Sequence, residues 1–386
     1  MRLLVIFPSA NRGGAENYAL TIAAAAVKNG WDVQAAFPKT SKTASLIKDF
    51  QDNGIVYHPL DIAPVGGHHF KLFREHLPQF FKTLLLLNKL RPDAVHLNLP
   101  WAYYGLDTLL ACGLLKIPTI VVFHLFPRRF FYSKSKLKAF AWVRSRNQKW
   151  IAISENNRQF ICESLNVPTS AISLIYNGTK IESPWTNLSN EEINQLRQQI
   201  RQELGISANS KILLTVARLT RVKGYAELSE VIIPILQEFP EVIFLWIGEG
   251  EMREYLEQKI QQNNLEKRVI ILGYRSDVLR FLKSSDLFIF PTHFEGLPLA
   301  IIEAMAHSLP IIASDASSLP EIIENKVHGV LFPSGNKQAL LEAINWALTH
   351  PEAIEEMAVR ARERTKEFSE EKMIKQTLAL IQEMTG

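Results

Sequence analysis

The chain has 386 residues, of which 47% are hydrophobic and 21% are charged, and its formal net charge is +4 at pH 7. At roughly 100–200 residues per domain, this length predicts two domains or three small ones. The composition excludes a collagen, a disordered chain and a multispan membrane protein. The two cysteines cannot form a disulfide framework, so we expect a protein of the reducing cytosol.

The sequence shows no targeting or membrane-spanning pattern. The first apolar run stops at Pro8, which is too early for the apolar region of a signal peptide. The four leucines at 84–87 fall far below the roughly 20 residues that span a bilayer. We therefore expect neither a leader nor a transmembrane segment.

Short apolar runs alternate with helix-like segments through the first half of the chain. The expected strands are Leu3–Phe7, Val33–Phe37, Ala94–Leu97, Thr119–Phe123 and Trp150–Ile153. The expected helices are Ala15–Lys28, Thr43–Asp52, Phe70–Leu90, Ala102–Leu115 and Lys134–Asn147. Strands without polar alternation, separated by helices, predict a parallel sheet that is covered on both faces. Residues 1–180 are therefore expected to form a doubly wound, Rossmann-like α/β domain.

A polar stretch then interrupts the alternation, and a second α/β series follows it. Residues 177–210 are interpreted as a linker with a lead-in helix, Glu191–Leu204. The strands expected after it are Lys211–Val216, Val242–Ile247, Val269–Leu272, Leu287–Phe290 and Pro310–Ala313. The helices expected at the end are Lys337–Thr349, Pro351–Glu367 and a last one that runs to Met384.

This second series predicts another Rossmann-like domain over residues 181–366. We expect the last segment, 367–386, to be a helix that crosses back to the first domain. Two doubly wound domains facing each other would place a ligand in the cleft between them, at the carboxyl ends of both sets of strands.

The first candidate site is Arg12-Gly13-Gly14-Ala15-Glu16, directly after the first expected strand. Two glycines allow the backbone to turn tightly and to approach a ligand closely. The helix N-terminus that follows can receive a negatively charged group. A plain strand-to-helix turn is the alternative, and the glycine pair alone does not decide between the two.

Two cations lie at the end of the first strand of the second domain. Arg218 would project from the strand end, and Lys223 from the start of the next helix. Arginine can grip two oxygens with its planar fork, and lysine acts as a point charge, so the pair suits a diphosphate. A solvated surface pair is the alternative, but the position at a strand's carboxyl end favours function.

A pair of carboxylates follows the strand that ends at Phe290. Glu295 lies in a loop, a helix is expected to start at Pro298, and Glu303 stands eight residues after Glu295. On a continuous helix, that spacing is up to about 12 Å along the axis and about 80° around it. The two carboxylates are then too far apart to share a proton, and we expect them at opposite ends of a long ligand.

Free backbone amides between these carboxylates are a further expectation. The amides that follow Gly296, at Leu297 and Leu299, would meet a phosphate at the start of the helix. The alternative is a helix-surface carboxylate at 303 and a helix-capping charge at 295.

Together these segments resemble the retaining glycosyltransferases of family 4, which have two Rossmann-like domains in the arrangement called GT-B. The resemblance covers essentially the whole chain, and the order and spacing of its segments make it specific. The matching segments are Gly13-Gly14-Ala15-Glu16, Ser154-Glu155, Tyr176-Asn177-Gly178, Arg218 with Lys223-Gly224, Ile247-Gly248-Glu249-Gly250, Leu272-Gly273-Tyr274, Glu295 with Glu303, Pro310-Ile311-Ile312-Ala313-Ser314 and Leu319-Pro320-Glu321-Ile322-Ile323.

The resemblance implies a role for several residues on the donor side. Gly14 would lie beside the donor phosphates, and Arg218 and Lys223 would hold the diphosphate and stabilise the leaving group. Glu295 would contact hydroxyls of the transferred sugar, and Glu303 would hold the ribose hydroxyls.

The remaining implied roles concern the base, the reacting centre and the acceptor. Main-chain groups around Gly273 and Tyr274 would meet the base. His124, at the end of an expected strand, matches the family histidine near the reacting centre of the sugar. Glu16 and Asn17 would lie on the acceptor side.

The implied reaction moves a sugar from a nucleotide diphosphate sugar, with a UDP-sugar favoured, to a saccharide or lipid-linked acceptor with retention of configuration. Such reactions build polysaccharides, glycolipids or other envelope glycans. The sequence contains no Asp-x-Asp motif, so we expect neither a metal nor a cofactor. Fixed cations and helix amides would then stabilise the departing diphosphate. No carboxylate is placed as a covalent nucleophile, which favours a same-face substitution in which a donor phosphate oxygen helps to remove the acceptor proton.

A basic and aromatic stretch without any Asp or Glu runs from Thr108 to Ser154. Its nine cations are Lys116, Arg128, Arg129, Lys134, Lys136, Lys138, Arg144, Arg146 and Lys149. Its interleaved aromatic residues are Phe123, Phe126, Phe130, Phe131, Tyr132, Phe140, Trp142 and Trp150. Cationic and aromatic side chains together suit an anionic membrane surface.

The part of this stretch around residues 126–150 therefore predicts peripheral binding to the inner face of the cytoplasmic membrane by a cytoplasmic protein. One alternative is a solvated helix whose aromatic residues belong to the core, and another is a site for an anionic sugar acceptor.

Three other functions are alternatives to glycosyl transfer. A nucleotide-sugar epimerase on the same fold would need further acid–base groups. A non-catalytic nucleotide-sugar-binding protein would be expected to lose Lys223 or one of the two glutamates, and this chain keeps all three. A nucleic-acid binder is disfavoured because the chain has no recognition motif and a low net charge.

Overall fold

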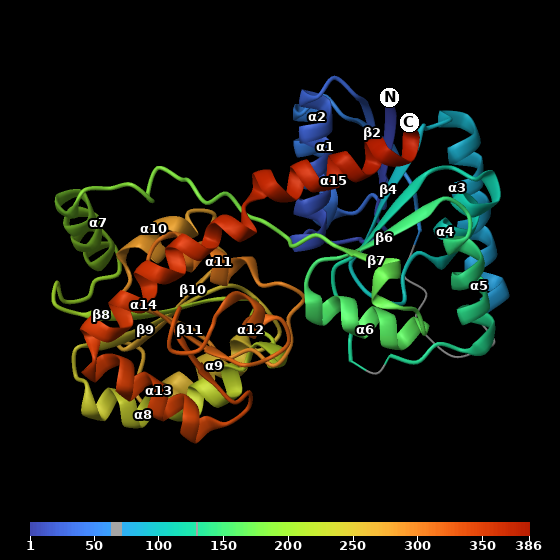
Figure 1. The fold of residues 1–386 in the computed structure, drawn as a ribbon. Helices are drawn as coiled ribbons and strands as arrows, with labels where there is room; N and C mark the ends of the chain where they lie inside the picture. Colours follow the sequence, from blue (N-terminus) through green and yellow to red (C-terminus); the bar gives the residue numbers. More distant parts are fainter. Residues whose placement is uncertain (63–71, 129) are drawn as a thin grey trace. The chain divides into compact units, whose positions relative to one another are not determined.

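The computed structural model describes residues 1–62, 72–128 and 130–386, and these fold into two compact units (Figure 1). Unit 1 comprises Met1–Asn177 and Glu371–Gly386, and unit 2 comprises Gly178–Glu370. The chain thus leaves unit 1 three residues before the expected boundary at 180 and returns four residues after the one at 366. Phe70 and Lys71 of an expected helix, and Arg129 of the basic stretch, lie outside the described residues.

Unit 1 is built on a sheet of seven parallel strands in the order β3-β2-β1-β4-β5-β6-β7. The strands are β1 (Arg2–Ile6), β2 (Asp32–Phe37), β3 (Val56–Pro59), β4 (Ala94–Leu99), β5 (Thr119–Phe123), β6 (Gln148–Ala152) and β7 (Ile172–Leu174). The helices are α1 (Gly14–Lys28), α2 (Ala44–Asp52), α3 (Leu72–Leu90), α4 (Leu106–Leu115), α5 (Lys134–Arg144) and α6 (Glu155–Leu165). Every described strand pairing in this sheet is parallel, which confirms the doubly wound class expected from the sequence.

Unit 2 is built on a second parallel sheet of six strands, in the order β10-β9-β8-β11-β12-β13. The strands are β8 (Lys211–Val216), β9 (Val242–Ile247), β10 (Val269–Gly273), β11 (Leu287–Phe290), β12 (Ile311–Ser314) and β13 (Val330–Phe332). The helices are α7 (Asn190–Glu203), α8 (Tyr225–Glu238), α9 (Arg253–Gln262), α10 (Val278–Ser284), α11 (Leu299–Ala306), α12 (Leu319–Ile322), α13 (Lys337–Thr349) and α14 (Pro351–Arg364). In both sheets the strand order reverses beside the first strand of the unit, and such reversals are where open α/β sheets bind ligands.

The last helix, α15 (Glu370–Thr385), packs on unit 1 beside α1 (Figure 1). The Thr377 hydroxyl lies 3.3 Å from that of Tyr18 on α1, and both side chains are buried. Glu383 accepts a 2.6 Å bond from Lys149 of β6. This chain-terminal helix therefore belongs to the core of the unit in which the chain begins.

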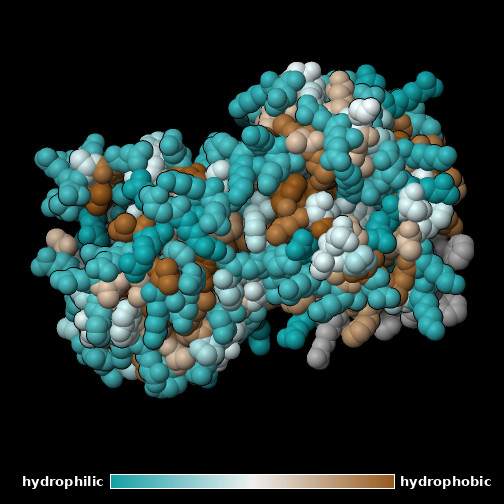
Figure 2. All heavy atoms as spheres, viewed as in Figure 1, coloured by the Kyte–Doolittle hydropathy of each residue, from teal (hydrophilic) through white to brown (hydrophobic). Residues whose placement is uncertain are grey.

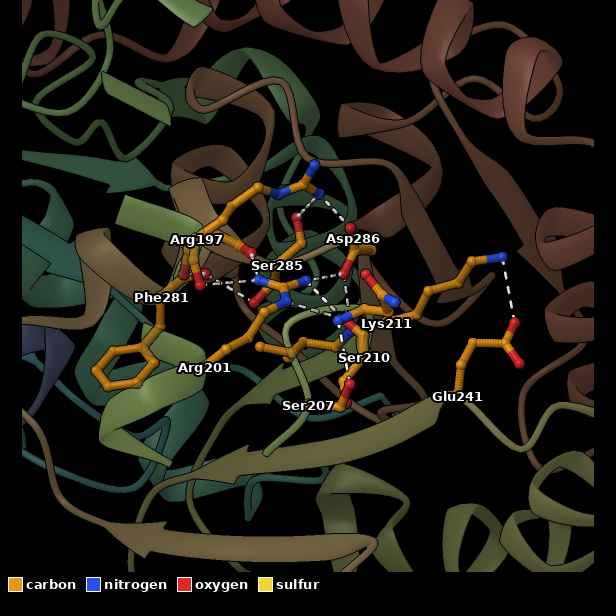
Figure 3. Close-up of polar contacts among 12 residues, drawn as sticks. Arg197, Arg201, Ser207, Ser210, Lys211, Glu241, Phe281, Ser285 and Asp286 are labelled. Carbon is orange, nitrogen blue, oxygen red and sulfur yellow. Dashed lines mark hydrogen bonds and ion pairs between the residues drawn. The ribbon is translucent and has the colours of Figure 1, made fainter. Parts of the chain in front are cut away.

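The lead-in helix α7 is fixed to the second sheet by a buried arginine (Figure 3). The Arg201 guanidinium donates to the carbonyl oxygens of Ser210 and Ser284 and pairs with Asp286 at 2.9 Å. Arg197, one helical turn earlier, pairs with the other oxygen of Asp286. The helix of the segment interpreted as a linker is therefore bonded to the second sheet and is part of unit 2.

Candidate functional site

Three loops at the carboxyl edge of the second sheet are held together by glycines that allow close backbone contact. A Cβ on Gly224, which has φ +74°, would overlap the carbonyl oxygen of Pro291 after β11. Gly248 and Gly250, after β9, lie against the backbone of the loop that follows β8. These contacts explain the glycines of two sequence motifs and fix the backbone around Arg218 and Lys223.

The two expected cations lie in the loop after β8, but their surroundings differ. Arg218 is exposed, and its side chain contacts no partner among the described residues. Lys223 forms an ion pair with Glu295, and the two side chains are only 13% and 10% exposed. The Lys223 ammonium also lies 5.8 Å from the centre of the Phe290 ring. The structure thus brings together a cation and a carboxylate that are 72 residues apart in the sequence.

Glu295 lies in the loop before a helix and Glu303 lies on that helix, as expected. Helix α11 begins at Leu299 with Pro298 as its N-cap, so the separation of about 12 Å that holds on a continuous helix does not apply to this pair. The position of Glu295 is fixed by the Lys223 pair and by a 3.4 Å bond from its amide to the Ser317 hydroxyl. The distance between the two carboxylates therefore cannot be calculated from the helical rise over eight residues.

Free amides do occur at the start of α11. The backbone N–H groups of Leu297 and Leu299 donate to no described residue, and Leu297 and Gly296 are buried. Unbonded amides at a helix N-terminus provide partial positive charge and hydrogen-bond donors for an anion.

Glu303 lies on α11 and has a strongly perturbed carboxyl group. Burial raises the pKa of Glu303 to about 7, and a hydrogen bond from the Thr179 hydroxyl opposes part of this rise. The bond from Thr179 Oγ1 to Glu303 Oε1 measures 3.3 Å. Thr179 was not identified from the sequence, although it directly follows the motif Tyr176-Asn177-Gly178.

The residues expected near the base are the last residue of β10, Gly273, and Tyr274, which directly follows it. Gly273 has φ +73°, and its carbonyl oxygen accepts from the Gly248 amide at 2.8 Å. Its main-chain oxygen therefore already supports the neighbouring loop. Tyr274 is 80% exposed, so its ring is open to a ligand.

The candidate residues of the first glycine motif lie at the start of α1 in unit 1. A Cβ on Gly14 would meet nothing within 4 Å, so no protein atom requires a glycine there. Glu16 is 4% exposed and turns into the unit, whereas the neighbouring Asn17 is exposed and accepts a 3.1 Å bond from Arg12. The two expected acceptor-side residues therefore face different environments.

His124 directly follows β5 and is 6% exposed. Its Nε2 atom lies 3.2 Å from Oδ1 of Asn98, on the neighbouring strand β4. Burial lowers the pKa of His124 to about 3, with a smaller contribution from His96. The ring is therefore neutral at physiological pH.

Half of the eight aromatic residues of the basic stretch belong to the core. Phe123, Phe126, Phe140 and Trp150 are all buried. Phe131, in contrast, is 86% exposed just before the basic helix α5. The alternative of core aromatic residues is correct for these four positions.

Residues 1–62, 72–128 and 130–386 contain no group of three or more His, Cys, Asp or Glu side chains that is arranged to bind a metal ion. No helix in these residues has the length and hydropathy needed to cross a bilayer.

Comparison with known proteins matches both units to one group of enzymes. Residues 197–367 match the family described as "Glycosyl transferases group 1", and residues 12–183 match "Glycosyltransferase Family 4". An uncharacterized glycosyltransferase of Methanocaldococcus jannaschii is 30% identical over 204 residues, which are 52% of this chain and 50% of that protein. The aligned part thus spans about half the length of that relative.

A second relative and a solved structure cover more of the chain. The UDP-Gal:alpha-D-GlcNAc-diphosphoundecaprenol alpha-1,3-galactosyltransferase of Escherichia coli is 28% identical over 269 residues, 67% of each chain. The crystal structure of Anabaena HepE in complex with UDP superimposes with a TM-score of 0.80 at 22% identity, covering 99% of this chain and 100% of that one. The paired parallel sheets and the two family matches lead to one conclusion: the chain belongs to the group 1 glycosyltransferases of family 4, with the GT-B fold.

Proposed function

We propose that this protein transfers a sugar, with retention of configuration, from a UDP-sugar to a saccharide or lipid-linked acceptor. The observation that carries the proposal is the arrangement at the carboxyl edge of the second sheet. There, an unpaired Arg218, the Lys223–Glu295 ion pair and the free amides at the start of α11 lie in loops that follow β8 and β11.

The charges of this edge suit a nucleotide diphosphate. A diphosphate needs several donors and cations as its bond to the sugar breaks, because the negative charge on the leaving group increases. Arg218 supplies a guanidinium that no described side chain neutralises, and α11 supplies free N–H groups. The donor would therefore bind with its phosphates between these groups.

The Lys223–Glu295 pair supplies a way to bind the diphosphate and the transferred sugar of the donor together. When Lys223 turns to a phosphate oxygen, Glu295 loses its partner and becomes a free hydrogen-bond acceptor. An ionised carboxylate accepts from hydroxyls, which are what the transferred sugar presents. The pair is nearly buried, so leaving either group without a new partner would be costly.

Glu303 would accept hydrogen bonds from the ribose hydroxyls, as the family resemblance implies. Only the ionised carboxylate offers all of its oxygens as acceptors. Because the pKa of Glu303 is raised to about 7, donor binding would depend on pH near neutrality.

The choice of uridine and of acceptor rests on relatives. The Anabaena structure holds UDP, and the name of the E. coli relative gives UDP-galactose as donor and a lipid diphosphate sugar as acceptor. We propose the same donor base and acceptor class for this chain. The transferred sugar is left open, and no metal or cofactor is included in the proposed reaction.

A lipid-linked acceptor would bring the protein to a membrane surface, and unit 1 carries a suitable face. Leu77, Phe81 and Leu85 recur every fourth residue on α3 and are all exposed, Leu85 by 70%. Helix α4 packs between α3 and the basic helix α5. We propose that these helices bind an anionic bilayer, with the apolar stripe in the interface and the lysines of α5 near the headgroups.

Three large exposed apolar side chains on one helix are unusual for this protein. Figure 2 shows that most of the visible surface of each unit is hydrophilic and that hydrophobic areas interrupt it only locally. A solvated helix normally keeps such residues on its buried face.

The test of the proposed function is a transfer assay on the full chain with a panel of UDP-, GDP- and ADP-sugars. Binding is measured in parallel as a shift in melting temperature. A donor at 100 times its dissociation constant should stabilise the protein by about 2.7 kcal/mol. We expect stabilisation by UDP and by at least one UDP-sugar. Stabilisation by GDP or ADP alone would overturn the uridine assignment, and no response to any nucleotide would overturn the donor site.

A further inference from the structure

A continuous chain of polar side chains crosses the core of unit 1 between β4 and β5. Asn98 and His96 lie two residues apart on β4, so their side chains point to the same face of the sheet. The Asn98 amide contacts a ring nitrogen of each histidine, with Nδ2 at 3.2 Å from His96 Nδ1 and Oδ1 at 3.2 Å from His124 Nε2. All six residues of β4 are buried.

With the Asn98 amide in this orientation, its two contacts indicate where the ring protons lie. The Oδ1 atom of Asn98 is an acceptor, so Nε2 of His124 must carry the hydrogen. A neutral imidazole has only one N–H, so Nδ1 of His124 bears a lone pair. The Nδ2 atom of Asn98 donates, so Nδ1 of His96 is the matching acceptor.

The nitrogen of His124 that bears the lone pair has no hydrogen-bond partner among the described residues. Some side-chain nitrogen and oxygen atoms among the described residues are fully buried and have no hydrogen-bond partner, and Nδ1 of His124 is not one of them. The Nε2 atom of His96, in contrast, is one of these fully buried atoms without a partner. The chain of contacts thus ends in an acceptor that remains open at His124.

The groups packed around His124 keep it uncharged. The Tyr18 ring of α1 meets it edge-on with centroids 4.9 Å apart, and His96 is the titratable group of β4 that faces it. Burial lowers the pKa of both histidines to about 3 and raises that of Tyr18. No carboxylate contributes to the pKa of His124.

We propose that Asn98 is a positioning residue that holds His124 as its neutral Nε2–H tautomer, so that Nδ1 accepts a hydrogen bond from a hydroxyl of the substrate. This inference depends on the proposed glycosyl transfer only for the identity of the substrate that carries the hydroxyl. The tautomer itself follows from the contacts of unit 1.

An asparagine suits this task better than any ionisable residue. It offers one donor and one acceptor at fixed distance, which is what two neutral imidazoles on either side require. An aspartate in its place would offer only acceptors and would add a charge that favours protonation of both rings.

The tautomer can be measured without substrate. Ring-nitrogen NMR shifts of the ¹⁵N-histidine-labelled full chain at pH 7 should show His124 as the Nε2–H tautomer, assigned with a His124→Gln variant. The Nδ1–H tautomer or a fast mixture of the two would overturn the proposal. This result stands even if transfer from a UDP-sugar is not detected.

The effect on catalysis is tested with three variants at saturating donor. Asn98→Leu should lower kcat by about 10–100-fold and leave the dissociation constant for UDP within threefold, because a reacting group that is misplaced by about 1 Å can cost about a hundredfold. Asn98→Asp should create a new pH dependence, with kcat falling from pH 8 to pH 6 as His124 takes up a proton.

Asn157→Asp is the matched control, because Asn157 is also a buried asparagine of unit 1 and has no contact with His124. It should show no such pH dependence of kcat. If Asn98→Asp has the pH profile of Asn157→Asp, or if Asn98→Leu keeps the kcat of the wild type, Asn98 does not position His124. If the wild type itself transfers no sugar, the proposed function is wrong. The inference about Asn98 and His124 is then tested only by the NMR measurement of the tautomer.

Discussion

The hydroxyl of Thr179 donates a 3.3 Å hydrogen bond to Oε1 of Glu303, and Thr179 is the second residue of unit 2 after the chain leaves unit 1. The backbone N–H and carbonyl groups of Thr179 are also hydrogen-bonded. The Thr179 amide donates to Phe368 O at 3.2 Å, and its carbonyl oxygen accepts from the Glu370 amide at 3.0 Å. The two segments that connect the units are thus bonded to each other and to the carboxylate proposed to bind ribose.

Removal of this hydroxyl should shift the pH dependence of donor binding. The Thr179 bond lowers a pKa that burial has raised to about 7, so Thr179→Val should raise the pKa of Glu303 further. In the wild type, KM for a UDP-sugar should fall as pH rises through about 7, because the ionised form binds the hydroxyls. In Thr179→Val that fall should move to higher pH, whereas Thr179→Ser should retain the wild-type profile. Identical profiles for all three proteins would contradict this coupling.

Glu303→Gln should make the protein more stable in alkaline solution. The folded-state pKa of about 7 lies above the ordinary value of 4.5, so the folded state holds more protons between these values and stability falls as pH rises through this window. Removing the charge should therefore raise the free energy of unfolding at pH 8 by on the order of 1–3 kcal/mol, with little change at pH 4.5. Urea unfolding at both pH values measures this difference.

The same Glu303→Gln variant should bind UDP more weakly, since an amide offers fewer acceptors than a carboxylate. Glu355→Gln, an exposed glutamate on α14, is the control and should change neither quantity. A Glu303→Gln protein that gains no stability at pH 8 would show that the carboxylate is well solvated there.

Transfer should proceed in the presence of a chelator and should retain the anomeric configuration of the donor. The proposed site meets the diphosphate with Arg218, Lys223 and backbone amides, so EDTA should change kcat by less than about twofold. NMR of the fresh product reports the configuration of the new bond. A tenfold loss in EDTA that Mg²⁺ restores, or an inverted product, would contradict this part of the proposal.

Binding to anionic vesicles should depend on the apolar stripe of α3. Phe81→Asp and Leu85→Asp each place a charge on that face and should reduce flotation with vesicles that contain phosphatidylglycerol. Val359→Asp alters a residue of unit 2 with similar exposure and should leave flotation unchanged. Flotation that is independent of anionic lipid, or equal for all four proteins, would count against a membrane face.

The parts of the fold that could be predicted from the sequence are those in which burial leaves a strong pattern. Central strands such as β5 and β9 are continuous apolar runs, and their ends were predicted correctly. The strands that were missed, β3, β7 and β13, all lie at sheet edges and have three or four residues. An edge strand is half solvated, so Val56 of β3 is 55% exposed, and the apolar run at each of these strands is too short to indicate a strand by itself.

The candidate site was predictable in its residue types and less so in its contacts. The glycines and charges of the loops after β8 and β11 could be identified, because they lie at strand ends. The Lys223–Glu295 pair and the Thr179–Glu303 bond join segments far apart in the chain, so no local pattern encodes them. His96 and Asn98 were missed because they lie within a buried strand, where only their polar nature among apolar neighbours marks them.

Replacing the two cations of the donor edge should affect the free energy of unfolding to different extents. Arg218 is exposed and unpaired, so Arg218→Ala should leave the free energy of unfolding unchanged within about 0.5 kcal/mol. Lys223→Ala leaves Glu295 nearly buried without its partner and should cost on the order of 3 kcal/mol. A Lys223→Met, Glu295→Gln double variant should recover most of that loss. All three variants should lower kcat, by about 100–1,000-fold for Arg218→Ala.

The most direct measurement is a calorimetric titration of UDP into the full chain and into Arg218→Ala. The account predicts that UDP binds the wild type at one site, and that Arg218→Ala weakens binding by at least tenfold while the fold keeps its stability. Arg221→Ala, two residues before Lys223, is the matched control and should bind UDP as the wild type does. Equal UDP affinity of the wild type and Arg218→Ala would contradict the placement of the diphosphate at this edge of the second sheet.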